Sequence, residues 1–196
     1  MTAKAAITTQ TGRTESAIVR PHTLNLQAID LCNSRCIMCN IWRDGRREKL
    51  SLEDFKQELA HPFYSEVRHV GITGGEPTLR KDLTELYELL PKLLPKLTGA
   101  SFITHGMQTE RTVEVYSKVH ALYRSLNLTF NGMVSLDGVG PVHDLVRGRK
   151  DAFETASQTL LQLKQRGVNV IAACTIVRSN VYGLHDLLEW GKPPAR

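Results

Sequence analysis

Three cysteines in one short segment, Cys32, Cys36 and Cys39, have the spacing that points most directly to chemistry. Their C-x3-C-x2-C pattern suits three corners of a [4Fe–4S] cluster and would leave the fourth iron without a protein ligand. An iron with a free position can bind and activate a small molecule. Cys174 lies far along the chain and His22 precedes the first expected strand, so neither is an obvious fourth ligand. A structural metal knuckle and unligated thiols are the alternative interpretations of this segment alone.

A second motif, Gly74-Gly75-Glu76-Pro77, follows a short apolar run. Two glycines let the backbone turn sharply and approach a ligand closely, and the proline fixes the exit of the turn. Such a turn leaves main-chain carbonyls free to accept hydrogen bonds from an ammonium group, while Glu76 can anchor the loop or add negative charge. A phosphate-binding loop competes, but the Gly-Lys-Ser/Thr ending is absent and a carboxylate would repel phosphate. A plain tight turn also fits the motif.

The elements that must position these motifs alternate between strand and helix, which predicts an α/β fold with a parallel sheet and about five βα units. The expected strands are Thr23–Asp30, Val67–Thr73, Ala100–Thr104, Leu128–Leu136 and Val168–Val177. The expected helices begin near Ser51 and Asp82, with Pro91 and Pro95 bending or ending the second, and cover Glu110–Leu126, Asp151–Gln165 and Gly183–Trp190. The last strand is almost continuously apolar, so we expect it to be covered on both faces and its Cys174 to be a buried core residue.

The candidate residues follow the carboxyl ends of the expected strands. The cysteines follow the first strand, Gly74 to Pro77 follow the second, Ser135 and Asp137 end the fourth, and Asn180 follows the fifth. Parallel α/β proteins bind ligands at this edge of the sheet, where the loops converge. We therefore expect one site at one rim.

The composition is that of one globular domain. The chain has 196 residues, 41% of them hydrophobic, and a formal net charge of +5. We expect a flexible arm over residues 1–20 and a single domain over 21–196. No apolar run is long enough to cross a bilayer, and the polar start lacks the apolar core of a secretory signal. Three cysteines in one loop favour a reducing, cytoplasmic location over a disulfide framework.

A small group of basic residues follows the cysteine segment and could attract an anionic partner. It comprises Arg43, Arg46, Arg47 and Lys49. No aromatic-rich basic stripe accompanies it, so nucleic-acid binding is not expected.

With the cysteine segment, the GGEP motif and the stretch SLDGVGPVHDLVRG, an SLDG-x8-R pattern, the chain resembles the radical S-adenosylmethionine (SAM) superfamily. The closest likeness is to its peptide-modifying and molybdenum-cofactor-type branch. The resemblance implies a partial TIM-like barrel, normally with six βα units. Only five are visible, so we expect either that the C-terminal end of the domain is truncated or that a partner supplies the missing wall. Extra domains often follow the barrel in that branch, but no cysteine-rich tail is visible here.

The resemblance also assigns roles. Cys32, Cys36 and Cys39 would ligate the cluster. The backbone of Gly74, Gly75, Glu76 and Pro77 would receive the amino group of SAM, and Ser135 and Arg147 would bind its carboxylate. Met38 would lie near the adenine, where the family usually has an aromatic residue. Asp137 could orient its loop, Arg147 could instead be an ordinary surface arginine, and His105 occupies a position where the family often has asparagine.

The implied activity is reductive cleavage of SAM by a [4Fe–4S] cluster, giving a 5′-deoxyadenosyl radical that abstracts hydrogen from a substrate. The substrate would be a small molecule or a peptide, and the electron would come from a donor such as flavodoxin or ferredoxin. A non-catalytic metal-binding or interaction remnant of the family is the alternative. No hydrolytic triad competes with either interpretation.

Overall fold

The structure is a computed structural model that describes residues 19–43 and 50–192. Most of the expected N-terminal arm (1–20) lies outside these ranges, as do Arg46, Arg47 and Lys49 of the basic group. None of the helices in the described ranges has the length and apolar character that spanning a bilayer requires.

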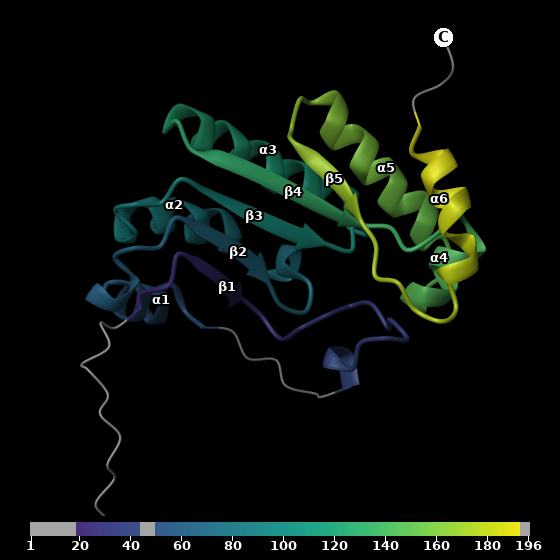
Figure 1. Cartoon of the computed structure of the whole chain (residues 1–196), viewed down its shortest axis with the longest axis horizontal. Helices are drawn as coiled ribbons and strands as arrows, with labels where there is room; N and C mark the ends of the chain where they lie inside the picture. The colour runs from purple at the N-terminus through teal and green to yellow at the C-terminus, as the bar shows by residue number, and fades with distance from the viewer. Residues whose placement is uncertain (1–18, 44–49, 193–196) are drawn as a thin grey trace, which may run out of the picture.

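Five parallel strands form one sheet in the order β1-β2-β3-β4-β5 (Figure 1). They are β1 (Thr23–Gln27), β2 (His69–Thr73), β3 (Gly99–Thr104), β4 (Thr129–Ser135) and β5 (Val170–Ala173). Each strand is parallel to the one before it, so every connection must cross back over the sheet, and helices make these crossings. The predicted α/β fold with five parallel strands is confirmed.

The helices that make the crossings gather on one side of the sheet, as Figure 1 shows for α2, α3 and α5. The α-helices are α1 (Leu52–Leu59), α2 (Leu83–Leu93), α3 (Thr109–Ser125), α4 (Pro141–Arg147), α5 (Ala152–Gln165) and α6 (Leu184–Trp190). Short 3-10 turns are η1 (Ile41–Arg43), η2 (Pro62–Tyr64), η3 (Pro77–Leu79) and η4 (Val181–Gly183). The predicted Ser51 cap is confirmed, because its hydroxyl accepts from the Asp54 amide in a full capping box.

An aromatic cluster fills the space between the sheet and these helices. It consists of Tyr87 from α2, Phe102 from β3, Tyr116 and Tyr123 from α3, and Phe130 from β4, all buried. The rings of Phe102 and Tyr116 lie 4.2 Å apart, and the Tyr116 hydroxyl donates to the Phe102 carbonyl at 3.1 Å. Burying rings with satisfied hydroxyls stabilises the sheet. The aromatic cluster therefore supports the strands whose carboxyl ends carry the candidate site.

The last strand departs from the prediction. β5 has four residues instead of the expected ten, Val168–Val177, and Ile171 is 58% exposed. Among the described residues β5 pairs only with β4, so its other edge is open. Cys174, just beyond the strand, is exposed, and its prediction as a core residue is wrong. An apolar run shows that a strand suits burial, but it does not reveal whether a neighbour covers the strand.

Helix α4 was not predicted, although its boundary signals are in the sequence. Pro141 is its first residue, where a missing amide costs nothing, and Gly148 follows its last residue with φ +62°. The proline and glycine lie inside the stretch interpreted as a ligand motif. In α2, Pro91 lies within the helix, which ends at Leu93 before Pro95.

Candidate functional site

The three cysteines line a single cavity of about 310 Å³ at the carboxyl ends of the strands. They lie in the loop that follows β1, which we name the cysteine loop and define as residues 28–40. Cys36 is buried, and Cys32 and Cys39 are half-buried. Among the described residues no three His, Cys, Asp or Glu side chains converge on one metal ion. A [4Fe–4S] cube binds each thiolate at a different iron, so it does not need three sulfurs on one atom.

Cys36 has two polar neighbours. The Ser34 hydroxyl lies 3.2 Å from its sulfur, and Nη1 of Arg147 donates to the same sulfur at 3.7 Å. The Ser34 hydroxyl donates its proton to the Arg147 carbonyl at 3.0 Å, so Arg147 is the charged donor that faces the Cys36 sulfur. The pKa of the Cys32 thiol is raised, first by burial and then by the negative charges of Glu76 and the other two cysteines, against a lowering hydrogen bond from the Ser34 backbone. A bound cation reverses this balance, because it favours the ionised sulfur.

Gly74 and Gly75 are required by a close approach of two loops. A Cβ on Gly74 would lie 2.3 Å from the Ile29 carbonyl oxygen, and one on Gly75 would lie 2.2 Å from that of Leu31. Gly74 also has φ +145°, which other residues rarely adopt. The Gly75 amide donates to Ile29, 2.7 Å away, so the turn is fastened to the start of the cysteine loop. Among the described residues no donor reaches the carbonyls of Gly74 and Gly75, which leaves them available to a ligand.

Glu76 anchors the turn to the end of β3. Its carboxylate accepts from the Thr78 hydroxyl at 2.6 Å, from the Thr104 hydroxyl at 2.7 Å and from the His105 amide at 2.9 Å. The side chain is 1% exposed. Glu76 was expected either to anchor the loop or to add negative charge, and these contacts are those of an anchor. Pro77 then begins the turn η3, which directs the chain away from the cavity.

Asp137 and Arg147 form a buried ion pair beside the cavity. Nε of Arg147 lies 2.5 Å from Oδ2 of Asp137, without the angles of a hydrogen bond, and the two side chains are 9% and 0% exposed. Arg147 is thus not a surface arginine. His143 supports the loop, because its Nδ1 accepts from the Asp137 amide at 2.9 Å. Ser135 and Met38 line the same cavity.

Asn180 fastens the segment after β5 to the Asp137 loop. Its amide group donates to the Asp137 carbonyl at 2.8 Å and to the Thr175 carbonyl at 2.9 Å, and its oxygen accepts from the Val177 amide. Asn180 is 1% exposed. Asp137 in turn accepts from the Thr175 amide through Oδ1. The polar residues that follow β4 and β5 therefore form one buried network behind the cavity wall.

His105 is a site residue whose role sequence reasoning did not find. Its Nε2 lies 2.6 Å from Oδ1 of Asn33 and 3.3 Å from the Glu76 carboxylate, and its Nδ1 accepts from the Met107 amide. Burial lowers the pKa of His105, Glu76 opposes this, and Arg147 and Arg149 add to the lowering. The neutral ring therefore donates from Nε2 to Asn33, which follows Cys32. The only feature of the sequence that indicated this role was the position of His105 directly after β3.

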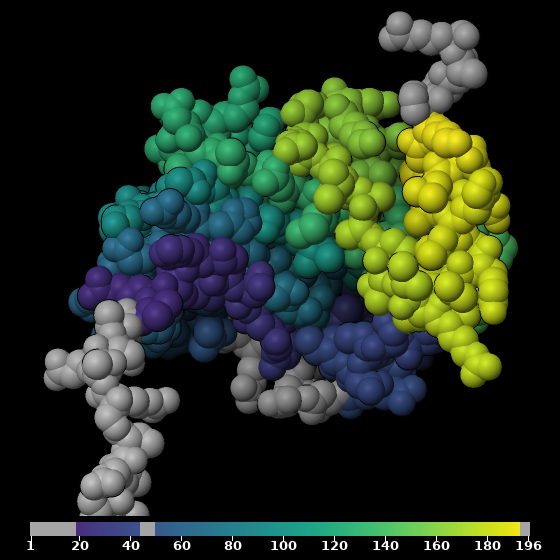
Figure 2. All heavy atoms as spheres, in the orientation of Figure 1, coloured from purple at the N-terminus to yellow at the C-terminus, as the bar shows by residue number. Residues whose placement is uncertain are grey.

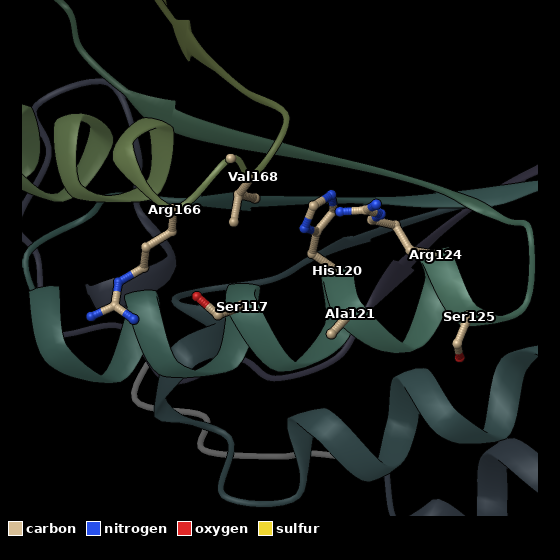
Figure 3. A pocket seen from close by; sticks show the side chains of 8 residues that line it. Ser117, His120, Ala121, Arg124, Ser125, Arg166 and Val168 are labelled. Carbon is tan, nitrogen blue, oxygen red and sulfur yellow. The ribbon is translucent and has the colours of Figure 1, made fainter.

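A larger hollow of about 730 Å³ lies near the C-terminal ends of α3 and α5, at the opposite end of the strands. Figure 3 shows Ser117, His120, Arg124 and Ser125 along α3, with Arg166 and Val168 on the segment that follows α5. It contains none of the predicted site residues. Its arginines lie in the last turns of their helices or just beyond them, where they complement the helix dipoles.

Comparison with known proteins identifies the family of this chain. Residues 26–189 match the radical SAM superfamily. The sporulation killing factor maturation protein SkfB of Bacillus subtilis strain 168 is 28% identical over 172 residues, which cover 86% of this chain and 39% of SkfB. Fe-coproporphyrin III synthase of Methanosarcina barkeri strain Fusaro is 35% identical over 171 residues, covering 83% of this chain and 40% of the synthase.

Among solved structures, Streptococcus suis SuiB bound to S-adenosylmethionine superposes with a TM-score of 0.68 at 17% identity, over 87% of this chain and 38% of SuiB. SuiB bound to its precursor peptide SuiA gives a TM-score of 0.63. This likeness shows the fold, which is that of a partial TIM-like barrel. The chain spans about two fifths of the length of these relatives. The expected peptide-modifying and molybdenum-cofactor-type branch fits them. Because the family match covers most of its length, the chain belongs to the radical SAM superfamily, whose cofactors are a [4Fe–4S] cluster and SAM.

Proposed function

We propose that the protein is an enzyme that holds a [4Fe–4S] cluster through Cys32, Cys36 and Cys39 and cleaves SAM reductively. One observation supports this most strongly. The three thiols, the Gly74–Gly75 turn, Ser135 and Arg147 come from four separate segments, yet all line one cavity of about 310 Å³. Three sulfur donors suit iron–sulfur chemistry, and the other groups suit an amino acid ligand.

Different residues around the cysteines bind different chemical groups of SAM. The free carbonyls of Gly74 and Gly75 accept from its ammonium group. Arg147 and the Ser135 hydroxyl bind its carboxylate, and Asp137 holds the guanidinium in place. Met38 packs against the adenine. The carbonyls and the guanidinium that line this cavity match the two charges of the amino acid end.

When bound, the cluster supplies one electron that cleaves SAM to methionine and a 5′-deoxyadenosyl radical. The protein contributes position and a dry wall. Glu76 and His105 join three loops through their side chains, so the rim does not open readily to water. Reduced thiols are needed for cluster assembly, and we place the protein in the cytoplasm as part of the same proposal.

The substrate is a peptide or a small molecule. A peptide is supported by SuiB, which was solved with a precursor peptide, and by the maturation protein SkfB. A small molecule is supported by Fe-coproporphyrin III synthase. The five-stranded sheet leaves β5 with an open edge among the described residues. That edge also favours the second candidate function, a cluster-binding or interaction module without a complete substrate site.

Anaerobic reconstitution followed by iron and sulfide analysis tests the cluster. The wild-type chain should bind about four irons and four sulfides, and Cys36→Ala should lose most of both. Cys174→Ala is the matched control, because this cysteine is exposed and does not line the cavity. Zinc without sulfide would contradict the proposal.

Incubation with SAM and dithionite then tests catalysis. The reconstituted wild-type protein should release 5′-deoxyadenosine, and Cys36→Ala should not. A protein that retains its cluster but never cleaves SAM would instead support the interaction module.

A further inference from the structure

We propose that an acidic electron-carrier protein docks on the surface directly outside Cys36. This inference rests on the proposed function, since reductive cleavage needs an electron from outside. The surface consists of three exposed arginines, Arg35, Arg43 and Arg149, around Ile37, Trp42 and Leu145, and we name it the arginine patch.

The patch is contiguous, although it comes from two segments more than a hundred residues apart. The guanidinium carbons of Arg35 and Arg43 lie 5.9 Å and 4.7 Å from the centre of the Trp42 ring. The Arg35 carbonyl approaches Gly148 so closely that a Cβ there would be 2.3 Å away, which brings Arg149 alongside. The Ile37 amide donates to Val146 at 2.9 Å, next to Leu145.

The patch has the composition of a docking surface for a negatively charged protein. Ile37 and Leu145 are 54% and 60% exposed, so the patch contains exposed apolar area as well as cationic groups. None of the three arginines pairs with a carboxylate within the described ranges. The nearby Asp144 carboxylate accepts from the amides of Asp151 and Phe153 and so faces α5. Complementary charge speeds the encounter of two proteins, and buried apolar area stabilises the complex once it has formed.

The position of the patch selects an electron carrier over other acidic partners. The Trp42 indole donates to the Cys36 carbonyl at 3.3 Å, and Arg35 and Ile37 are the two neighbours of Cys36 in the chain. Figure 2 shows this blue segment of the chain at the surface. Electron transfer slows steeply with distance, so a donor must dock where the cluster comes closest to solvent. The step moves one electron from a low-potential flavin or iron–sulfur carrier to the cluster, and no bond forms or breaks.

The experiment compares two reductants on the reconstituted protein. Dithionite is small and needs no docking surface, whereas a reduced acidic ferredoxin does. The double variant Arg43→Glu/Arg149→Glu changes the patch outside the three cysteines. Its rate of cluster reduction by ferredoxin, followed by visible absorbance, should fall about tenfold or more at low salt, and its dependence on salt should weaken. Its reduction by dithionite should stay at the wild-type rate.

The matched control is Arg166→Glu/Arg124→Glu, the same charge change at the other end of the strands. It should reduce with both reagents as the wild type does. Binding of labelled ferredoxin without SAM gives a second readout, which should weaken only in the patch variant. Equal loss in both variants, unchanged ferredoxin rates in the patch variant, or an equal loss with dithionite would each overturn the proposal. An inactive wild type that still binds ferredoxin at the patch would count against the proposed function and not against the docking surface.

Discussion

Arg147 joins three parts of the site through one side chain. It pairs with Asp137, approaches the Cys36 sulfur and lines the cavity. The SLDG-x8-R pattern identified this arginine from sequence, because the pattern depends only on spacing along the chain. The contact of His105 with Asn33 spans 72 residues and no local pattern encodes it, so it required the structure.

Replacing Arg147 should destabilise the fold as well as the site. Arg147→Gln leaves the Asp137 carboxylate buried without its cation, and the free energy of unfolding should fall by about 3–5 kcal/mol. Adding Asp137→Asn should recover part of the loss. Urea unfolding of the cluster-free protein measures both. Arg149→Gln, at an exposed position, should change the value by less than about 0.5 kcal/mol, and a loss equal to that of Arg147→Gln would contradict the pairing.

His143 should make stability depend on pH. Burial and the Arg147 charge lower its pKa to about 4, against the raising effects of Asp137 and Asp144. The unfolded chain, with a histidine pKa of about 6.5, binds the proton first. The stabilising effect is therefore complete above about pH 6.5 and is lost as the pH falls toward 4, by at most about 3 kcal/mol.

Unfolding free energies measured from pH 7 to pH 4 should show this slope. His143→Gln keeps an acceptor for the Asp137 amide but cannot take a proton at these pH values, so its slope should be flatter. An unchanged slope in the variant would contradict the assignment.

At the scale of elements, the turn after β2 and the loop after β1 act as one unit. The sequence predicts that the glycines of that turn let the backbone approach a ligand, which stays a prediction, and the structure shows that they also allow the close approach of another loop. The partner, the backbone of Ile29 and Leu31, was not identified, because a glycine does not encode what approaches it. Helix α4 was missed for a different reason, since its proline and glycine signals lay within a stretch already given a ligand-binding role.

Gly75→Ala should separate the two loops. Its methyl group would collide with the Leu31 carbonyl, at a cost of about 1–3 kcal/mol in unfolding free energy, and iron loading after reconstitution should fall. Gly191→Ala provides the control, because a methyl group there would meet its nearest atom at an ordinary 3.5 Å. Equal iron content in both variants would show that the close approach does not position the cysteines.

Asn180→Ala should loosen the segment after β5. The Asp137 carbonyl and the Val177 amide would lose their partners, and the cost should be about 1–3 kcal/mol. Hydrogen exchange should then accelerate at Val177 and Thr175 while the amides of β3 keep their protection. Unchanged exchange at both positions would contradict the role given to Asn180.

At the scale of the whole molecule, the sheet has a buried centre and, among the described residues, two edge strands, β1 and β5. The order of strands and helices followed from hydrophobic periodicity, because each element buries its own face. The exposure of β5 could not be predicted from this periodicity, because exposure depends on what lies beside the strand and not on the strand itself. Ile171 and Cys174 are therefore more exposed than their apolar surroundings suggested.

The open edge of β5 should promote self-association at high concentration. Ile171→Lys should reduce it in sedimentation velocity experiments, with a stability change below about 0.5 kcal/mol. Leu161→Lys, on an exposed face of α5, makes the same kind of change away from the edge and should leave association unchanged. If both variants sediment as the wild type does, the edge does not mediate association.

The bonds between the cysteine loop and the end of α4 have a thermodynamic consequence. The Ser34 hydroxyl and the Arg35 amide both donate to the Arg147 carbonyl, so the proposed metal ligands and the guanidinium share one backbone support. Iron loading that orders this support would raise the affinity for the cosubstrate. Binding of the cosubstrate must then raise the affinity for iron by the same factor. Such reciprocity would slow loss of the inorganic group during turnover.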